Sequence, residues 1–215
     1  QLNLPKAVIL GNHDRGNDLS GELLTSQLRL LGDNHCGWAF RDWESPPLAV
    51  IGGRPCSPGG GFYLSQAVRA KYGPVTIEES ANRIVLAAKK APIDWPLIIL
   101  AHSGPTGLGS EKTSICGRDW KSPALDWGDR DLSLAIDQIR KFRPPSLVVF
   151  GHMHHSLRRG NETRNTFLVD RWGTAYLNSA CVPRKGTDQS GDSLAHLSWV
   201  EYKNGALCFV SHRWY

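Results

Sequence analysis

Four short apolar runs constrain the fold of this chain more than any other feature. One of them ends in a glycine, and the other three are followed directly by a glycine or a histidine. The first is AVILG, residues 7–11, and the same arrangement returns at residues 48–51, 97–101 and 147–150. Short apolar runs of this kind are typical of strands buried on both faces of a parallel sheet. The sequence therefore predicts four central strands.

Helical patterns lie between these runs. Leucines at helical spacing over residues 24–31 are closed by Gly32, and residues 76–79, Thr-Ile-Glu-Glu, form a capping box ahead of a helical pattern that reaches Ala88. A third helical pattern covers residues 132–139. Strands that alternate with helices indicate an α/β fold with a layered core.

The pattern changes after residue 165. Residues 166–169, 175–178, 194–202 and 206–211 are predicted to form antiparallel strands, and Lys203-Asn204-Gly205 is a turn signal between the last two. We expect an antiparallel region to complete the α/β layers.

Composition narrows the classes of protein to consider. A chain of 215 residues suits one domain, and a net charge of +5 suits an anionic substrate but is small for a dedicated nucleic-acid binder. The five cysteines include no CxxC pair, which favours reduced core thiols and an intracellular location, cytoplasmic or organellar. No apolar stretch is long enough to predict contact with a membrane interior.

Polar residues follow three of the predicted strands. They stand in Gly11-Asn12-His13-Asp14, in His102-Ser103-Gly104 and in Gly151-His152-Met153-His154. Each motif alone has an ordinary explanation, a turn or a pair of surface histidines. All three occur at strand ends, where the loops of α/β sheets converge, and imidazole nitrogens aimed at one point suit a transition metal.

In this order the motifs GNHD, HSG and GHMH resemble those of the calcineurin-like metallophosphoesterases, whose pattern runs DxH, GD, GNH[D/E], H and GHxH. The resemblance spans residues 7–155. It implies a layered α-β-β-α sandwich over residues 1–215 and a metal-dependent phosphoric-ester hydrolase. Such an enzyme uses two metal ions, Mn, Fe or Zn, to activate water.

The resemblance also implies roles for individual residues. Asn12, His102 and His152 would bind one metal, and His154 would bind the other. His13 would face the scissile phosphate as a catalytic residue, with Asp14 fixing its tautomer.

The DxH and GD motifs do not precede GNHD in this sequence. The nearest substitute, Gly32-Asp33-Asn34-His35, follows a predicted helix and is interpreted as a turn at its C-terminus. We therefore expect an N-terminally incomplete domain whose missing strands leave sheet edges unpaired. Such a chain would be poorly stable and inactive on its own.

Other residues are candidates for contact with substrate. Arg54 and Arg118 lie in long irregular stretches, 52–61 and 104–128, and arginine suits bidentate phosphate binding, although surface arginines are common.

Trp120 and Trp127 have two interpretations, stacking on a base or sugar and ordinary packing. A basic group after GHMH would line the approach to the site or form a solvated face; it comprises Arg158, Arg159, Arg164, Arg171, Arg184 and Lys185. His155 should point away from His154 and be packed or solvent-facing rather than a ligand.

Three functions remain open at this point. The first is hydrolysis of a phosphorylated small molecule or protein, and the second is a nuclease or cyclic-nucleotide phosphodiesterase on the same scaffold. Nucleic acid is the less favoured partner because the basic excess is small. The third is a non-catalytic binding module that lacks the first metal site.

Overall fold

The protein is a mixed α/β structure, described by a computed structural model for residues 4–158 and 161–215. Its larger sheet has six strands in the order β1-β2-β3-β4-β6-β5. These are β1 Phe40–Glu44, β2 Pro47–Gly52, β3 Leu97–Leu100, β4 Leu147–Phe150, β5 Phe167–Val169 and β6 Ala175–Asn178. The central strands β2, β3, β4 and β6 run parallel, and β1 and β5 flank them antiparallel. The predicted α/β class is confirmed.

The prediction of a strand over residues 7–11 is wrong. This segment is extended but forms only one isolated bridge, between Val8 and His35. Its hydrogen bonds go to a turn and a loop: the Val8 amide donates to Asn34 O at 2.7 Å, and Leu10 O accepts from the Cys56 amide at 2.8 Å. A turn and a loop offer too few aligned backbone groups to continue a ladder, so the apolar run packs beside the sheet without joining it.

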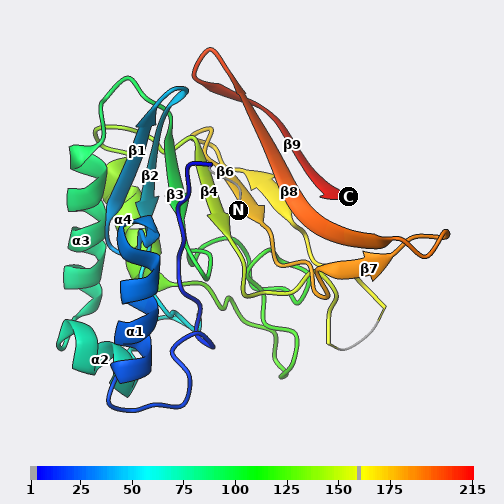
Figure 1. Cartoon of the computed structure of the whole chain (residues 1–215), viewed down its shortest axis with the longest axis horizontal. Coiled ribbons are helices and arrows are strands. Elements are labelled where there is room, and N and C mark those ends of the chain that lie inside the picture. Colours follow the sequence, from blue (N-terminus) through cyan, green and yellow to red (C-terminus); the bar gives the residue numbers. More distant parts are fainter. Residues whose placement is uncertain (1–3, 159–160) are drawn as a thin grey trace.

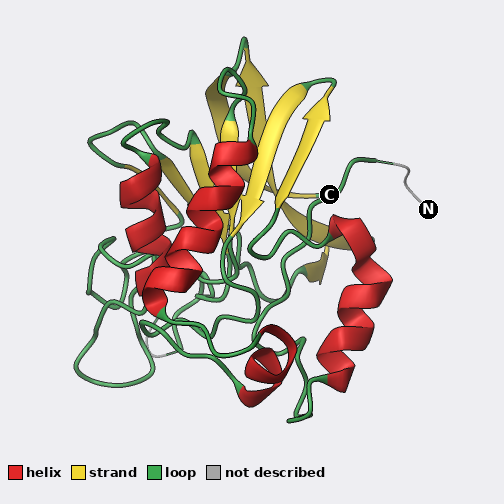
Figure 2. Ribbon diagram, turned by 90° about the vertical axis from the view of Figure 1, so that its left-hand side faces the viewer, coloured by secondary structure: helices red, strands yellow, loops and turns green. Residues whose placement is uncertain are grey.

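The helices are α1 Glu22–Leu31, α2 Gln66–Tyr72, α3 Ile77–Lys90 and α4 Arg130–Ile139. Of these, α3 and α4 pack on one face of the larger sheet, whereas α1 and α2 pack against each other in a second cluster with Leu10 and Cys56 (Figures 1 and 2). The predicted capping box of α3 is present, with Thr76 and Glu79 each bonded to the other's backbone amide. Gly32 ends α1 and opens the short 3₁₀ turn Gly32–Asn34, which confirms the interpretation of that segment as a turn. The main core lies between α3, α4 and the sheet.

A second sheet covers the other face (Figure 1). It contains β7 Lys185–Thr187, β8 Ser193–Lys203 and β9 Ala206–Trp214, all antiparallel. Asn204 and Gly205 have φ of 52° and 77°, the backbone of a type I′ hairpin turn, so the predicted turn is confirmed. Val200, Leu207 and Val210 pack on β4 and β6 and attach this hairpin to the larger sheet. The strand over 175–178 is also confirmed, although it pairs parallel with β4 as well as antiparallel with β5.

The cysteines are free thiols, as expected, but they are not all in the core. Cys36, Cys56 and Cys116 are buried, Cys181 is half-buried and Cys208 is exposed. Within the described ranges 4–158 and 161–215, no helix has the length and apolar character needed to cross a membrane.

Candidate functional site

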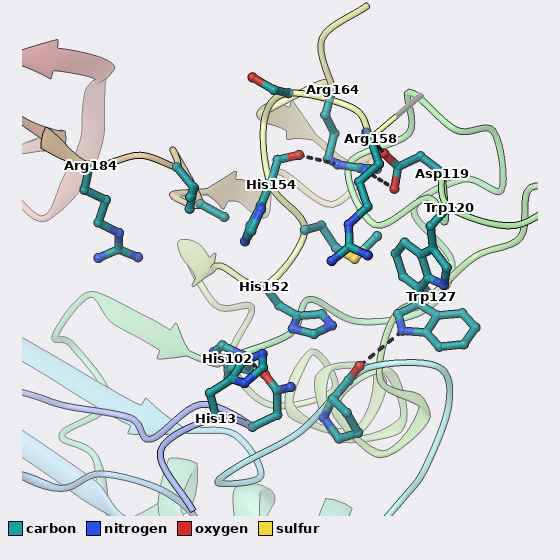
Figure 3. A pocket seen from close by; sticks show the side chains of 16 residues that line it. His13, His102, Asp119, Trp120, Trp127, His152, His154, Arg158, Arg164 and Arg184 are labelled. Atoms are coloured by element: carbon teal, nitrogen blue, oxygen red, sulfur yellow. Dashed lines mark hydrogen bonds and ion pairs between the residues drawn. The ribbon is translucent and has the colours of Figure 1, made fainter. Parts of the chain in front are cut away.

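A pocket of about 370 Å³ opens where β3 and β4 end, beside the turn that follows residues 7–11 (Figure 3). It gathers the four predicted metal ligands, called here the pocket ligand set: Asn12, His102, His152 and His154. His13 also lines the pocket. The remaining lining residues are Pro58, Asp119, Trp120, Trp127, Met153, Ser156, Arg158, Arg164, Ala180, Val182 and Arg184.

Asn12 and His102 meet directly in this pocket. His102 Nε2 lies 2.9 Å from Asn12 Oδ1. Gly11 makes this contact possible, because a Cβ at that position would lie only 2.6 Å from His102 Cε1. Two donor atoms that are 90 positions apart in the chain therefore lie within hydrogen-bond distance, against a glycine that has no side chain to displace the ring.

His152 reaches the same place through an unusual backbone. Its φ is 65°, in the left-handed region that few residues other than glycine adopt. The His102 and His152 ring centroids are 5.1 Å apart, in an edge-to-face arrangement. Strain of this kind persists only where the surrounding structure holds the residue in place, and it is common at functional sites.

Burial keeps the imidazoles of His102 and His152 neutral. Burial, reinforced by the positive potential of neighbouring histidines, lowers the pKa of His102 to about 3 and that of His152 to about 4. Burial, followed by the charge of Arg158, also lowers the pKa of His154. A neutral imidazole has a nitrogen lone pair available, which is the form that binds a metal.

Arg164 holds the segment that carries His154. Its Nε donates to His154 O at 2.9 Å, and its Nη1 donates to the carbonyls of Lys112 and Ser114 at 3.0 and 2.9 Å. It also pairs with Asp119 at 3.4 Å. The side chain is buried, so the interpretation of the basic group as a solvated face is wrong for Arg164.

Two other members of that basic group line the pocket. Figure 3 shows Arg184 on one side of the histidines and Arg158 on the other. Both residues are exposed. Arg171 lies elsewhere, with its guanidinium 4.0 Å from the Trp172 ring, and Arg159 lies outside the described residues.

His13 lines the pocket and is exposed. The predicted role of Asp14 differs from what the structure contains. Asp14 Oδ2 accepts from the Gly11 amide at 2.6 Å and closes its own turn, and within the described residues no His13–Asp14 hydrogen bond is formed. A short carboxylate beside a free amide in the same turn forms this local bond readily.

Arg54 is not in the pocket, contrary to the predicted role in substrate binding. It is 2 % exposed, and its guanidinium contacts Asp129 at 2.6 Å and Asp131 at 3.0 Å. Two carboxylates at the start of α4 attract this buried cation more strongly than an open cavity would. Arg54 therefore fastens the loop after β2 to α4.

Arg118 is also held by contacts within the protein and not by the pocket. It is buried, its Nη2 donates to Pro123 O at 2.7 Å, and its guanidinium lies 5.3 Å from the Trp127 ring. It does not line the pocket, whereas Trp120 and Trp127 do, with ring centroids 5.0 Å apart.

The donor set fits one borderline transition metal. Asn12 supplies an amide oxygen, and His102 and His152 supply nitrogens, which suit Mn, Fe or Zn. For a second ion, His154 is the one predicted ligand. Asp119, the one acid among the described lining residues, is already bound to Arg164 and to the Arg158 amide.

Sequence reasoning missed Asp119, and it named Arg164 only as a member of the basic group after GHMH. Asp119 follows Arg118 in the motif Cys-Gly-Arg-Asp-Trp, and nothing in the local pattern distinguishes a buried ion pair from a solvated one.

Comparison with protein-family models finds no match for this chain, and comparison with curated proteins finds no significant relative.

Proposed function

We propose that this protein is a metal-dependent phosphoric-ester hydrolase whose substrate is a phosphorylated small molecule or protein. The observation that carries the proposal is the convergence of Asn12, His102 and His152 in one pocket. Asn12 Oδ1 and His102 Nε2 are 2.9 Å apart, and the His152 ring is 5.1 Å from that of His102. A bound metal at these atoms would supply Lewis acidity and lower the pKa of a bound water.

The other lining residues suit a phosphate group. The exposed Arg158 and Arg184 offer planar cationic donors that match phosphoryl oxygens. His13, which lines the pocket and is exposed, would donate a proton to a leaving oxygen. These residues bind and orient the substrate, while His102 and His152 stay neutral at pH 7 because burial lowers their pKa values.

The proposal includes the layered α-β-β-α sandwich. Support comes from the order of the described layers, in which α3 and α4 cover one face of the six-stranded sheet and the β8–β9 hairpin covers the other. It also includes an intracellular location, cytoplasmic or organellar, supported by free thiols at Cys36, Cys56 and Cys116.

One observation favours a second candidate, a nuclease or cyclic-nucleotide phosphodiesterase. Trp120 and Trp127 line the same pocket, and the Arg158 guanidinium lies 5.8 Å from the Trp120 ring. An aromatic ring beside a cation suits a nucleobase next to its phosphate. A substrate with a base would then lose affinity in Trp120→Ala, and glycerol phosphate, which has no aromatic ring, would not.

The test separates a metal ligand from a catalytic residue. Metal content is measured after chelation and reloading with Mn²⁺ or Zn²⁺ for the wild-type chain, His152→Ala and His13→Ala. We expect His152→Ala to lose metal at the pocket and His13→Ala to retain it. Hydrolysis of p-nitrophenyl phosphate and bis(p-nitrophenyl) phosphate is then measured on the product of the whole coding sequence.

Three outcomes discriminate the functions. Metal-dependent turnover that falls at least a hundredfold in His13→Ala supports the hydrolase. Metal and phosphate binding without turnover supports the non-catalytic binding module. Equal metal retention in His152→Ala and the wild type contradicts the proposed metal centre.

A further inference from the structure

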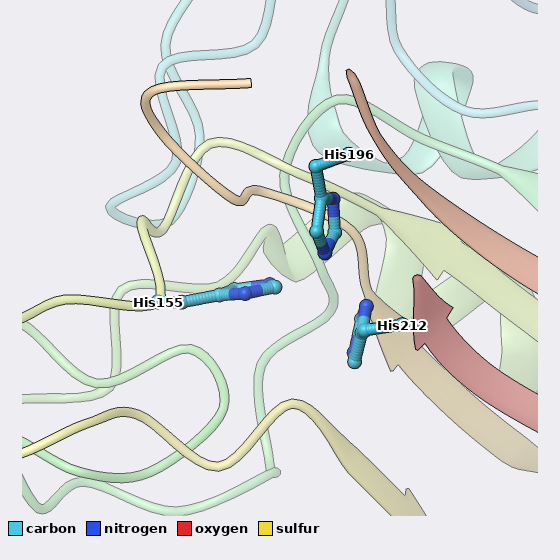
Figure 4. A group of neighbouring side chains, drawn as sticks. All are labelled: His155, His196 and His212. Atoms are coloured by element: carbon cyan, nitrogen blue, oxygen red, sulfur yellow. The ribbon is translucent and has the colours of Figure 1, made fainter. Parts of the chain in front are cut away.

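A second group of histidines lies outside the pocket. His155, His196 and His212, the histidine trio, each offer a ring nitrogen, and these three atoms lie within 4.8 Å of one another. Figure 4 shows the three side chains reaching from separate stretches of chain toward one point. All three residues are half-buried. They come from the loop after β4 and from both strands of the β8–β9 hairpin.

The hydrogen bonds of His155 leave one nitrogen free to bind a ligand. His155 Nε2 lies 2.9 Å from Asn178 O. A carbonyl only accepts, so Nε2 carries the proton and Nδ1 keeps its lone pair. A backbone acceptor on the second ring nitrogen is the usual support for a metal-binding histidine, because it fixes both the tautomer and the ring orientation.

His212 has the complementary arrangement. Its Nδ1 lies 3.0 Å from Ser198 Oγ, and its Nε2 is buried without a hydrogen-bond partner among the described residues. In the tautomer that has its proton on Nδ1 and donates it to Ser198 Oγ, the buried Nε2 keeps a free lone pair. A buried polar atom without a partner requires an explanation, and the ability to bind a cation would provide one.

The hairpin brings His196 and His212 onto the same face. Ser198 pairs with His212 across the two strands, so His196 and His212 are diagonal neighbours. Their ring centroids are 5.4 Å apart, and the His155 centroid is 4.9 Å from that of His212. The Trp214 ring packs edge-on against His196 at 5.2 Å and limits its movement.

We propose that His155, His196 and His212 form a mononuclear site for a borderline divalent cation, Zn²⁺ in the first place. Three neutral imidazoles are a known type of zinc ligand set, and the fourth tetrahedral position is left to water or another small ligand. With Zn–N bonds of about 2.0–2.1 Å, tetrahedral ligand atoms lie roughly 3.3 Å apart. The three ring nitrogens now lie within 4.8 Å of one another, so small side-chain rotations would bring them to this separation.

The bound ion would fasten the hairpin to the body of the protein. His155 belongs to the segment that leaves the central strand β4, and the other two ligands belong to the outer sheet. A metal that binds the folded but not the unfolded chain stabilises the fold by mass action. This site is independent of the proposed hydrolase function, because it shares no residue with the pocket ligand set.

The test uses Zn²⁺ alone and removes the pocket first. The double variant His102→Ala/His152→Ala is dialysed against Zn²⁺, and bound zinc is measured by mass spectrometry, with circular dichroism to verify folding. We expect one zinc per chain, and near zero when His212→Ala or His196→Ala is added. We also expect the thermal midpoint to rise with Zn²⁺ only while the trio is intact.

Ser198→Ala serves as a milder probe of the same site. It removes the hydroxyl that orients His212 and should weaken zinc binding roughly 10- to 100-fold without removing a ligand. Absence of zinc from a folded double variant, or zinc retained after both His196→Ala and His212→Ala, overturns the proposal. If the wild type still binds one metal in the first case, the pocket centre survives that result.

Discussion

Two adjacent histidines, His154 and His155, belong to two different groups. His154 lines the pocket with His102 and His152, whereas His155 faces the hairpin with His196 and His212. The residues of the pocket ligand set belong to short motifs that can be recognised in the sequence. Two members of the histidine trio, His196 and His212, stand singly in the sequence, and the trio forms only because one sheet packs onto the other.

The two groups bring residues that are distant in the chain together in two different ways. In the pocket, neighbouring parallel strands β3 and β4 end at the same edge of the sheet, so a histidine after each strand is delivered to one place. In the trio, packing of Val200, Leu207 and Val210 on β4 and β6 brings the hairpin against the residues that follow β4. The placement of His102 and His152 depends on sheet topology, and the placement of the trio depends on tertiary packing.

The largest expected effect comes from Arg54→Ala. This substitution tests whether the ion pairs that hold the wall of the pocket also stabilise the whole fold. Arg54 fastens the loop that carries Pro58, a residue of the pocket wall, to Asp129 and Asp131. Removing one partner leaves two buried carboxylates uncompensated, at a cost of about 3–5 kcal/mol. We expect urea denaturation to show this loss of unfolding free energy.

The exposed Arg29→Ala is the matched control, and it should change the free energy of unfolding by less than about 0.5 kcal/mol. Equal denaturation midpoints for the two variants would mean that the Arg54 network does not stabilise the fold.

Asn178→Ala should damage the pocket more than the trio. Asn178 Nδ2 donates to Met153 O at 2.6 Å, between His152 and His154, whereas His155 Nε2 donates to the backbone carbonyl of Asn178, which the substitution keeps. The side chain is fully buried, and its loss leaves a carbonyl and an amide without partners, at about 2–3 kcal/mol in the free energy of unfolding.

Metal titrations of Asn178→Ala should then show weaker binding at the pocket and a smaller change at the trio. The exposed Asn165→Ala is the control, expected to behave as the wild type. Equal weakening at the two groups would contradict this difference in support.

The metal-free chain should lose stability as the pH falls from 7 to 5. In the folded state the pKa of His102 is about 3 and that of His152 about 4, below the usual 6.5. The unfolded chain therefore binds more protons in this range. The stabilisation is complete above about pH 6.5 and is lost as the pH falls toward the folded-state values, at up to about 1.4 kcal/mol per pH unit for each histidine.

Urea denaturation at successive pH values measures this slope. Burial also lowers the pKa of His212 to about 4, so His102→Asn and His212→Asn should each reduce the slope by a similar amount. A slope that is unchanged in His102→Asn contradicts the assignment of this histidine as a buried neutral group.

The sequence predicted the parts of the molecule that local patterns determine. Short apolar runs located β2, β3 and β4, and the capping box located the start of α3. The prediction of a strand over residues 7–11 was wrong, because an apolar pattern indicates burial and not hydrogen-bonded pairing. Arg54 misled for a similar reason: its motif gives no sign of the two carboxylates that lie more than 70 positions further along the chain.

The histidine trio could not be predicted, because a β-bulge decides its geometry. Near the turn, Tyr202 pairs with Leu207, and a regular hairpin would continue to pair Leu197 with His212. The irregularity next to Glu201 leaves Cys208 as an extra residue, after which Leu197 pairs with Arg213 and Ser198 with His212. A shift of one residue moves a side chain to the opposite face, so this bulge places His212 beside His196.

The smallest expected effect, that of Gly11→Ala, sharpens the comparison most because it reaches one group only. A Cβ at this position would lie 2.6 Å from His102 Cε1, and the ring borders an open cavity into which it can move. The cost in unfolding free energy should be about 1 kcal/mol, at the low end for overpacking. Displacement of His102 from Asn12 should weaken metal binding at the pocket at least tenfold, while zinc binding at the trio stays unchanged. Gly151→Ala is the matched control, since the nearest atoms would lie 3.8 Å from its Cβ. Equal pocket affinities for Gly11→Ala and Gly151→Ala would show that the close approach of His102 to Gly11 does not set the geometry of the metal centre.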